Sequence, residues 1–92
     1  MERLTHMHEG KYYANDNAVN RSSEGYSGEA INRLGVFENV YEDLLASQSE
    51  ISDQLASLRN EGKEKSVKFK ELMVKKLTNI NTIILLKSYG LE

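Results

Sequence analysis

Two histidines near the N-terminus are the first residues of this 92-residue chain whose side chains are suited to chemistry. His6 and His8 lie two positions apart, so on a β-strand their imidazoles would point to the same face, with Glu9 beside them. A closed zinc site needs about four ligands. The chain has no cysteine and no third histidine to complete such a set. We therefore expect two solvent-facing histidines and no metal site.

Acidic residues form a second set. Glu38, Glu42 and Asp43 stand on adjacent turns of a predicted helix, where paired carboxylates can serve acid–base catalysis. No base or oxyanion donor lies near them in the sequence, and the glycines form no phosphate-binding motif. We predict that the chain is not an enzyme and binds no cofactor. The same acidic face, extended by Glu50 and Asp53, can instead imitate phosphates before a basic nucleic-acid channel, unless it is simply a solvated surface.

The C-terminal third of the chain is rich in lysine. Residues 1–61 carry eleven acidic and five basic residues, and residues 62–92 carry seven lysines and three acidic residues, for a net charge of −2. The split predicts either two oppositely charged helices that pack together or a basic segment that meets nucleic acid. No arginine stands in this segment, which favours the first interpretation. The candidate phosphate contacts are Lys63, Lys65, Lys68, Lys70, Lys75 and Lys76.

Residues 69–91 loosely follow the pattern of a helix-turn-helix, with the turn near Leu77 and Thr78. The turn glycine is missing, and residues 82–88 offer almost only apolar side chains where a recognition helix needs polar groups to read bases. A small DNA-binding transcriptional regulator is therefore the alternative function.

The sequence divides into three stretches, of which residues 1–27 are the first. Residues 4–8 and 11–14 flank the turn Glu9-Gly10 and predict a short N-terminal β-hairpin or extended arm. The segments 15–17 and 21–25 are expected to be turns or a mobile linker. The tyrosines of this stretch can stack on a base or a partner, or cover the edge of a core. These tyrosines are Tyr12, Tyr13 and Tyr26.

A helix is predicted over about residues 28–61, with Ser27 as its N-cap and Gly62 as its C-cap. From Leu34 to Leu58 apolar residues recur in steps of three and four, interrupted by Gln48. This heptad seam is typical of a coiled coil or bundle, in which Gln48 would help to fix the register.

A second helix is predicted over about residues 66–89, with Ser66 as its cap and a break near 78–82, where threonine and asparagine are poor helix formers. The run Ile83–Leu86 is apolar on every face, and a short chain cannot cover it. We therefore predict a mainly α protein, in which residues 28–92 form a long antiparallel helical hairpin that pairs into a dimeric bundle. The residues expected at the oligomer interface are Leu44, Ile51, Leu55, Ile80, Ile83, Ile84 and Leu86.

Three short motifs stand in the first 40 residues: the opening MERLT, KYY after the glycine turn, and AINRLGVFE at residues 30–38. On these motifs the chain resembles small accessory proteins of Firmicutes bacteriophages and prophages. The resemblance covers about the first 40 residues and, in part, the C-terminal run 61–91. It implies a protein that binds and inhibits or modulates a host bacterial protein, including CRISPR effectors. No functional residues carry over from it, and a structural phage oligomer is a further alternative.

The expected location is the cytoplasm of the bacterial host. The N-terminus lacks the apolar core of a signal peptide, and the longest apolar run is far too short to span a membrane. The lack of cysteine fits a reducing compartment.

Overall fold

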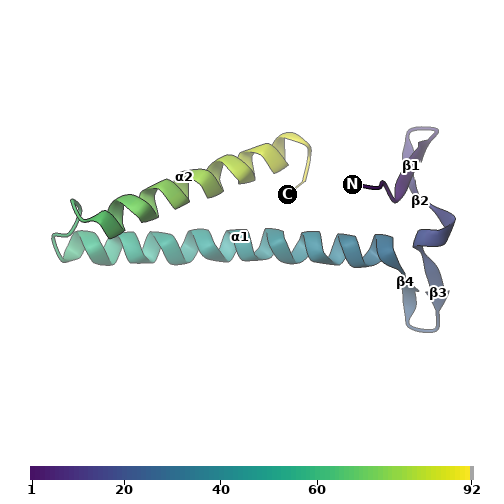
Figure 1. Cartoon of the computed structure of the whole chain (residues 1–92), viewed down its shortest axis with the longest axis horizontal. Helices are drawn as coiled ribbons and strands as arrows, with labels where there is room; N and C mark the ends of the chain where they lie inside the picture. Colours follow the sequence, from purple (N-terminus) through teal and green to yellow (C-terminus); the bar gives the residue numbers. More distant parts are fainter. Residues whose placement is uncertain (92) are drawn as a thin grey trace. The chain divides into compact units, whose positions relative to one another are not determined.

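The computed structural model describes residues 1–91 as two compact units, residues 1–40 and the chain from Tyr41 onward. The elements follow one another as drawn in Figure 1. They are β1 Thr5–His8, β2 Lys11–Ala14, the 3-10 turn η1 Asp16–Ala18, β3 Asn20–Ser22, β4 Gly25–Ser27, α1 Glu29–Asn60 and α2 Val67–Ser88. The mainly helical class and the N-terminal hairpin are therefore confirmed. The division between the units falls inside α1, whereas the sequence analysis placed it after residue 27.

The first hairpin forms where its turn chemistry predicts it. β1 and β2 pair antiparallel, with His6 opposite Tyr13 and His8 opposite Lys11. The two turn residues, Glu9 and Gly10, have φ angles of 49° and 80°. Positive φ at both central positions is the geometry of the type I′ turn, whose twist matches that of the flanking strands.

A second hairpin, β3–β4, stands where turns or a mobile linker were expected. Turns are present at residues 16–18 and at Ser23 and Glu24, but the residues that flank the second turn are paired strands. The main cross-strand contact of the hairpin joins Arg21 to Tyr26, which lie directly opposite each other. The Arg21 guanidinium donates to the Tyr26 hydroxyl at 2.9 Å and lies 5.3 Å from the centre of the ring. At the turn, the Ser22 hydroxyl accepts from the Glu24 amide at 3.3 Å. These polar contacts stabilise the hairpin, whose strands do not alternate apolar and polar residues.

Gly28 joins the strands of the first unit to α1. Its carbonyl accepts from the Asn32 amide at 2.9 Å, so Gly28 is the N-cap of α1, whereas Ser27, the expected cap, ends β4. Gly28 has a φ of 117°, and a β-carbon added there would lie 2.5 Å from the carbonyl oxygen of the buried Ala18. Only glycine allows both this backbone conformation and this close approach.

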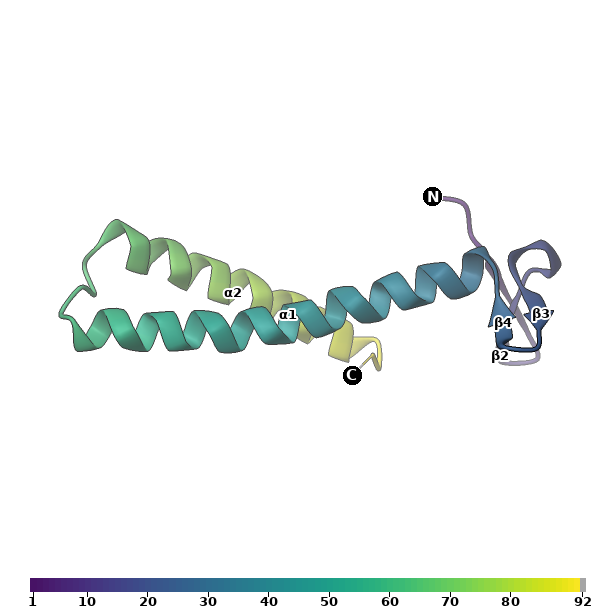
Figure 2. The same cartoon turned by 90° about the horizontal axis from the view of Figure 1, so that it is seen from below.

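The two helices form the predicted hairpin within the second unit, where α2 returns alongside α1 (Figure 2). Its core is the contact of Ile51 and Leu55 on α1 with Leu72 on α2. Leu58, Phe69 and Met73 pack around that contact. Ile51 and Leu55 are 3% and 1% exposed within a single chain, so they have no free surface for an oligomer interface. Their expected role in an interface is corrected accordingly.

Both helix ends follow from local sequence. Gly62, with a φ of 71°, donates to the Arg59 carbonyl at 3.0 Å, and Lys63 donates to the Leu58 carbonyl at 2.8 Å. This pair of bonds is the Schellman motif, and it confirms Gly62 as the C-cap. At the start of α2 the Ser66 hydroxyl accepts from the Phe69 amide at 3.2 Å, which confirms Ser66 as the N-cap.

The helix α2 is continuous, so the break expected near 78–82 is wrong. The Thr78 and Thr82 hydroxyls donate to the carbonyls four residues earlier, at 3.0 and 2.9 Å. Each hydroxyl thus makes its hydrogen bond within the helix and does not draw the backbone into a non-helical conformation. The helix-turn-helix is excluded for the same reason, because Leu77 and Thr78 lie within α2.

A polar layer interrupts the seam between the helices. The Gln48 amide donates to the Lys76 carbonyl at 3.4 Å, and the Asn79 amide donates to the Ser47 hydroxyl at 3.4 Å. Within residues 1–91 the buried Oε1 of Gln48 accepts no hydrogen bond. A buried acceptor without a donor costs about 1–3 kcal/mol.

Gly28→Ala is expected to destabilise the first unit more than Gly25→Ala does. Gly25 has nearly the same φ, 119°, but a β-carbon there meets nothing within 4 Å. The added clash with Ala18 should cost about 1–3 kcal/mol beyond the backbone strain that both variants share. Native-state hydrogen exchange of the strand amides measures the difference, and equal losses of protection would contradict the close approach.

Gln48→Leu is expected to stabilise the helical hairpin by about 1 kcal/mol, because it removes the unpaired acceptor from the seam. Urea unfolding followed by helical circular dichroism measures the change. Gln54→Leu is the matched control, since Gln54 is exposed on the same helix and its replacement should shift stability by less than about 0.5 kcal/mol. Destabilisation by Gln48→Leu alone would show that the seam depends on the amide.

Candidate protein-binding surfaces

The histidines lie on one face of the first hairpin, as their spacing predicts. The Tyr13 ring lies near both, with its centre 6.0 Å from the His6 ring and 6.2 Å from the His8 ring. The Nδ1 of His6 is 2.8 Å from Oδ1 of Asn15. Residues 1–91 hold no group of three or more residues of the types that bind metal ions. The two histidines therefore belong to an aromatic and polar surface.

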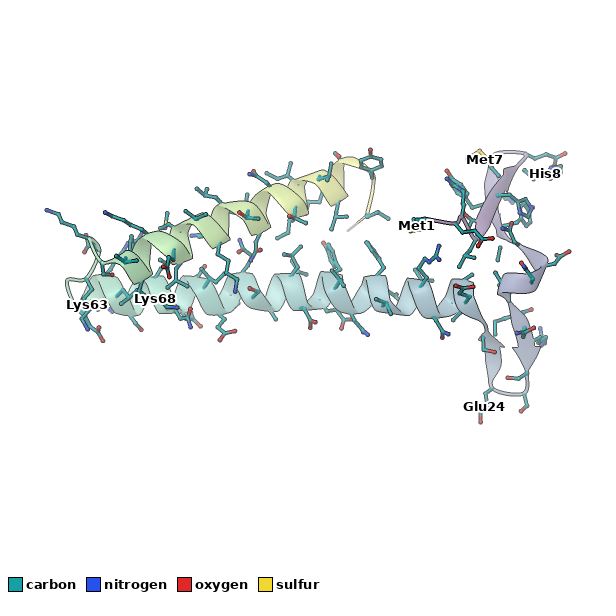
Figure 3. All side chains as sticks on the ribbon, in the orientation of Figure 1. Met1, Met7, His8, Glu24, Lys63 and Lys68 are labelled. Atoms are coloured by element: carbon teal, nitrogen blue, oxygen red, sulfur yellow. The ribbon has the colours of Figure 1, made fainter. Side chains whose placement is uncertain are left out.

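Tyrosines supported by arginine are exposed on both hairpins. Tyr12 and Tyr26 are 62% and 58% exposed, so neither covers a core edge. The Arg3 guanidinium lies 5.5 Å from the centre of the Tyr12 ring, which parallels the pair of Arg21 and Tyr26. Figure 3 shows Met7 and His8 near the tip of the first hairpin. Tyrosine, arginine and methionine are enriched at protein interfaces, so this composition suits contact with a protein.

The acidic face is formed as the helical spacing predicts. We use the name for five exposed residues of α1, and at 3.6 residues per turn they fall within an arc of roughly 140° opposite the seam. They are Glu38, Glu42, Asp43, Glu50 and Asp53. The ion pairs of the described chain join His8 to Glu9, Arg33 to Glu29 and Lys63 to Glu61, and so leave the acidic face without a partner. The face therefore presents its full negative charge.

The lysines do not gather in the same way. On α2, Lys68 and Lys75 share one side, and the spacing puts Lys70 on nearly the opposite side. Lys76 is partly buried, and its carbonyl accepts from Gln48 in the seam. Lys63 lies 3.1 Å from the Glu61 carboxylate in the loop. Lys63 to Lys76 thus give no single basic face, although most of their side chains are exposed.

An open groove of about 340 Å³ borders the acidic face at the loop end of the hairpin. Leu58 and Leu72 provide its apolar part. Asp53 of the acidic face lines it together with Glu61 and Lys68. An apolar centre with a charged rim is the usual anatomy of a protein interface. This groove was not predicted from the sequence, because Leu58 repeats at seam spacing and no local signal marks it as partly accessible.

The remaining residues expected at an oligomer interface are distributed unevenly. Leu44, Ile80, Ile83 and Leu86 are partly buried, whereas Ile84 is 59% exposed.

Among residues 1–91, no helix is both long and apolar enough to cross a membrane.

Comparisons with protein-family models, with curated proteins and with solved structures found no match to this chain. Inference about function therefore depends on the surfaces of the chain itself.

Glu42→Lys is expected to stabilise the free protein by about 0.5 kcal/mol, because it replaces a carboxylate repulsion with Glu38, four residues earlier, by an attraction. Urea unfolding at low salt measures the gain. In the Glu38→Gln background the gain should shrink to the difference in helix propensity. A gain of the same size in both backgrounds would show that the two positions do not interact.

Proposed function

We propose that the chain is a non-catalytic, phage-derived protein that binds a bacterial host protein and inhibits or modulates it in the host cytoplasm. The observation that carries this proposal is the acidic face, whose five exposed carboxylates make no ion pair within residues 1–91. A surface of one charge sign steers and selects a partner of the opposite sign.

The partner that fits this surface is a protein with a basic channel for nucleic acid, such as a CRISPR effector. Glu42 and Asp53 are eleven residues apart on α1, which is about 16 Å along the helix. That distance equals about five phosphate steps of a nucleic-acid strand at 3.4 Å each. The adjoining groove, with Leu58 and Leu72, adds an apolar contact that a nucleic acid would not offer. The carboxylates attract a basic channel, and the apolar groove favours a protein over a nucleic acid as the partner.

The proposal includes pairing with a second copy through a coiled-coil-like contact, because the apolar residues of α2 exceed what the hairpin buries. Leu72 is the buried residue of α2 in the described chain. A DNA-binding regulator is less well supported, since α2 has no turn and its lysines point to different sides. No observation favours a purely structural oligomer over a binding protein.

The test is capture of host proteins from a bacterial lysate followed by elution with duplex DNA. We expect DNA to release the captured target, because the DNA and the acidic face would occupy the same basic channel of the target. Glu42→Lys/Asp43→Lys should weaken capture by at least about tenfold, since each reversal turns a favourable charge contact into repulsion. Lys65→Glu/Lys75→Glu is the matched control, since both lysines are exposed and neither lines the groove, and it should leave capture unchanged.

Two outcomes would contradict the proposal. If capture survives reversal of the charges at Glu42 and Asp43, the acidic face does not act as a phosphate mimic. A mobility shift of duplex DNA by the chain itself, strong at about 50 mM salt and lost by about 200 mM, would favour the regulator instead. That shift should then disappear in Lys68→Glu/Lys70→Glu.

A further inference from the structure

We propose that the outer side of α2 is a dimer surface, on which a second copy of the chain lays its own α2 in antiparallel orientation. This inference rests on the pairing included in the proposed function and specifies its surface. It does not depend on the identity of a host target.

The surface consists of exposed apolar side chains on the side of α2 that faces away from the core. Val74, Leu77 and Ile84 are 64%, 55% and 59% exposed, although each is a large apolar residue. With Asn81 they follow the steps of three and four that define a heptad seam, and Val67 stands one heptad before Val74. We call Val67, Val74, Leu77, Asn81 and Ile84 the outer stripe. Figure 3 shows side chains leaving α2 on the side away from α1.

The two helices bury few of their apolar side chains against each other. The hydrophobic residues buried within the described chain are Leu4, Ala18, Ile51, Leu55 and Leu72, a small core for 92 residues.

The charge pattern along α2 makes the helix complementary to itself in antiparallel orientation. Its first half carries four lysines, at positions 68, 70, 75 and 76, whereas residues 77–86 contain no charged side chain. Parallel pairing would bring the two lysine-rich halves together. Antiparallel pairing lays each lysine-rich half on an uncharged half and separates the lysine clusters by more than the screening length of about 8 Å. It also aligns the two helix dipoles favourably.

One register pairs the positions of the outer stripe from Val74 to Ile84. When Leu77 lies opposite Asn81 of the second copy, Val74 lies opposite Ile84 of the second copy, by the same step. Lys70 then lies opposite Ser88 of the second copy, in the last turn of α2, where the helix dipole favours a cation. Since the seam of the hairpin and the outer stripe lie on different sides of α2, the second copy can pack on α2 without displacing α1. The acidic face of α1 stays free.

Disulfide cross-linking tests both the orientation and the register, and it is clean because the chain has no cysteine of its own. In the antiparallel register Val74→Cys/Ile84→Cys should form a covalent dimer under mild oxidation. The two positions cannot join within one helix, because ten residues span about 15 Å and a disulfide needs Cα atoms within about 7 Å. Val74→Cys alone should stay monomeric on denaturing gels. Efficient cross-linking of Val74→Cys alone would reveal a parallel pair and overturn the proposal.

Sedimentation of charge variants tests whether the outer stripe forms the interface. Leu77→Glu should weaken the dimer by roughly 100-fold, because it buries an unpaired charge. Thr82→Glu is the matched control, since Thr82 is exposed on α2 outside the outer stripe, and it should dimerise like the wild type. Unchanged helical circular dichroism in both variants shows that the hairpin itself is intact.

A wild-type chain that sediments as a monomer at micromolar concentration would overturn the proposal, and so would a Leu77→Glu dimer as tight as that of the wild type. Neither result bears on binding by the acidic face. Conversely, loss of capture in Glu42→Lys/Asp43→Lys with the cross-link intact would leave the dimer standing. The two proposals therefore fail independently.

Discussion

The packing of Leu72 against Ile51 and Leu55 is the contact on which the helical hairpin depends. It lies in the half of the hairpin near the loop, where Gly62 ends α1 and Ser66 begins α2 at positions that allow the helices to face each other. Beyond it the seam turns polar at Gln48. So small a core buries too little apolar area to offset the entropy of ordering two helices by a wide margin. Much of the apolar and charged surface of α1 and α2 is consequently left for contacts with other molecules.

Three surfaces of the two helices are left in this way, and Asp53 is the one residue that belongs to two of them. The acidic face uses the side of α1 opposite the seam, the groove with Leu58 uses the loop end, and the outer stripe uses the far side of α2. Helical periodicity makes this division possible, because residues three or four positions apart share a side. The exposed tyrosines on the two hairpins add a further surface within the first unit, held in place by arginine rather than by burial.

Features encoded by neighbouring residues were predictable from the sequence, and features that need a distant partner were not. The turn at Glu9 and Gly10, the caps at Gly62 and Ser66 and the acidic face each follow from local spacing. The β3–β4 hairpin escaped prediction because strands of three residues are too short to show a period. Gly28 displaced Ser27 as the cap because of Ala18, ten residues away. The helix continues through Thr78 because the Thr78 hydroxyl donates to the Val74 carbonyl. Helix propensity alone does not predict this hydrogen bond.

β1 pairs with β2, β3 pairs with β4, and α1 packs on α2. A chain organised in this way closes only short loops as it folds, so its folding time belongs to the microsecond-to-millisecond class of helical proteins. Both hairpins of the first unit form their strand ladders from residues that precede α1, since β4 ends at Ser27. The core of the second unit, by contrast, exists only when Leu72 of α2 has folded back onto Ile51 and Leu55 of α1. Opening of the helical hairpin would therefore expose the core of the second unit and leave the hydrogen bonds of both strand ladders in place.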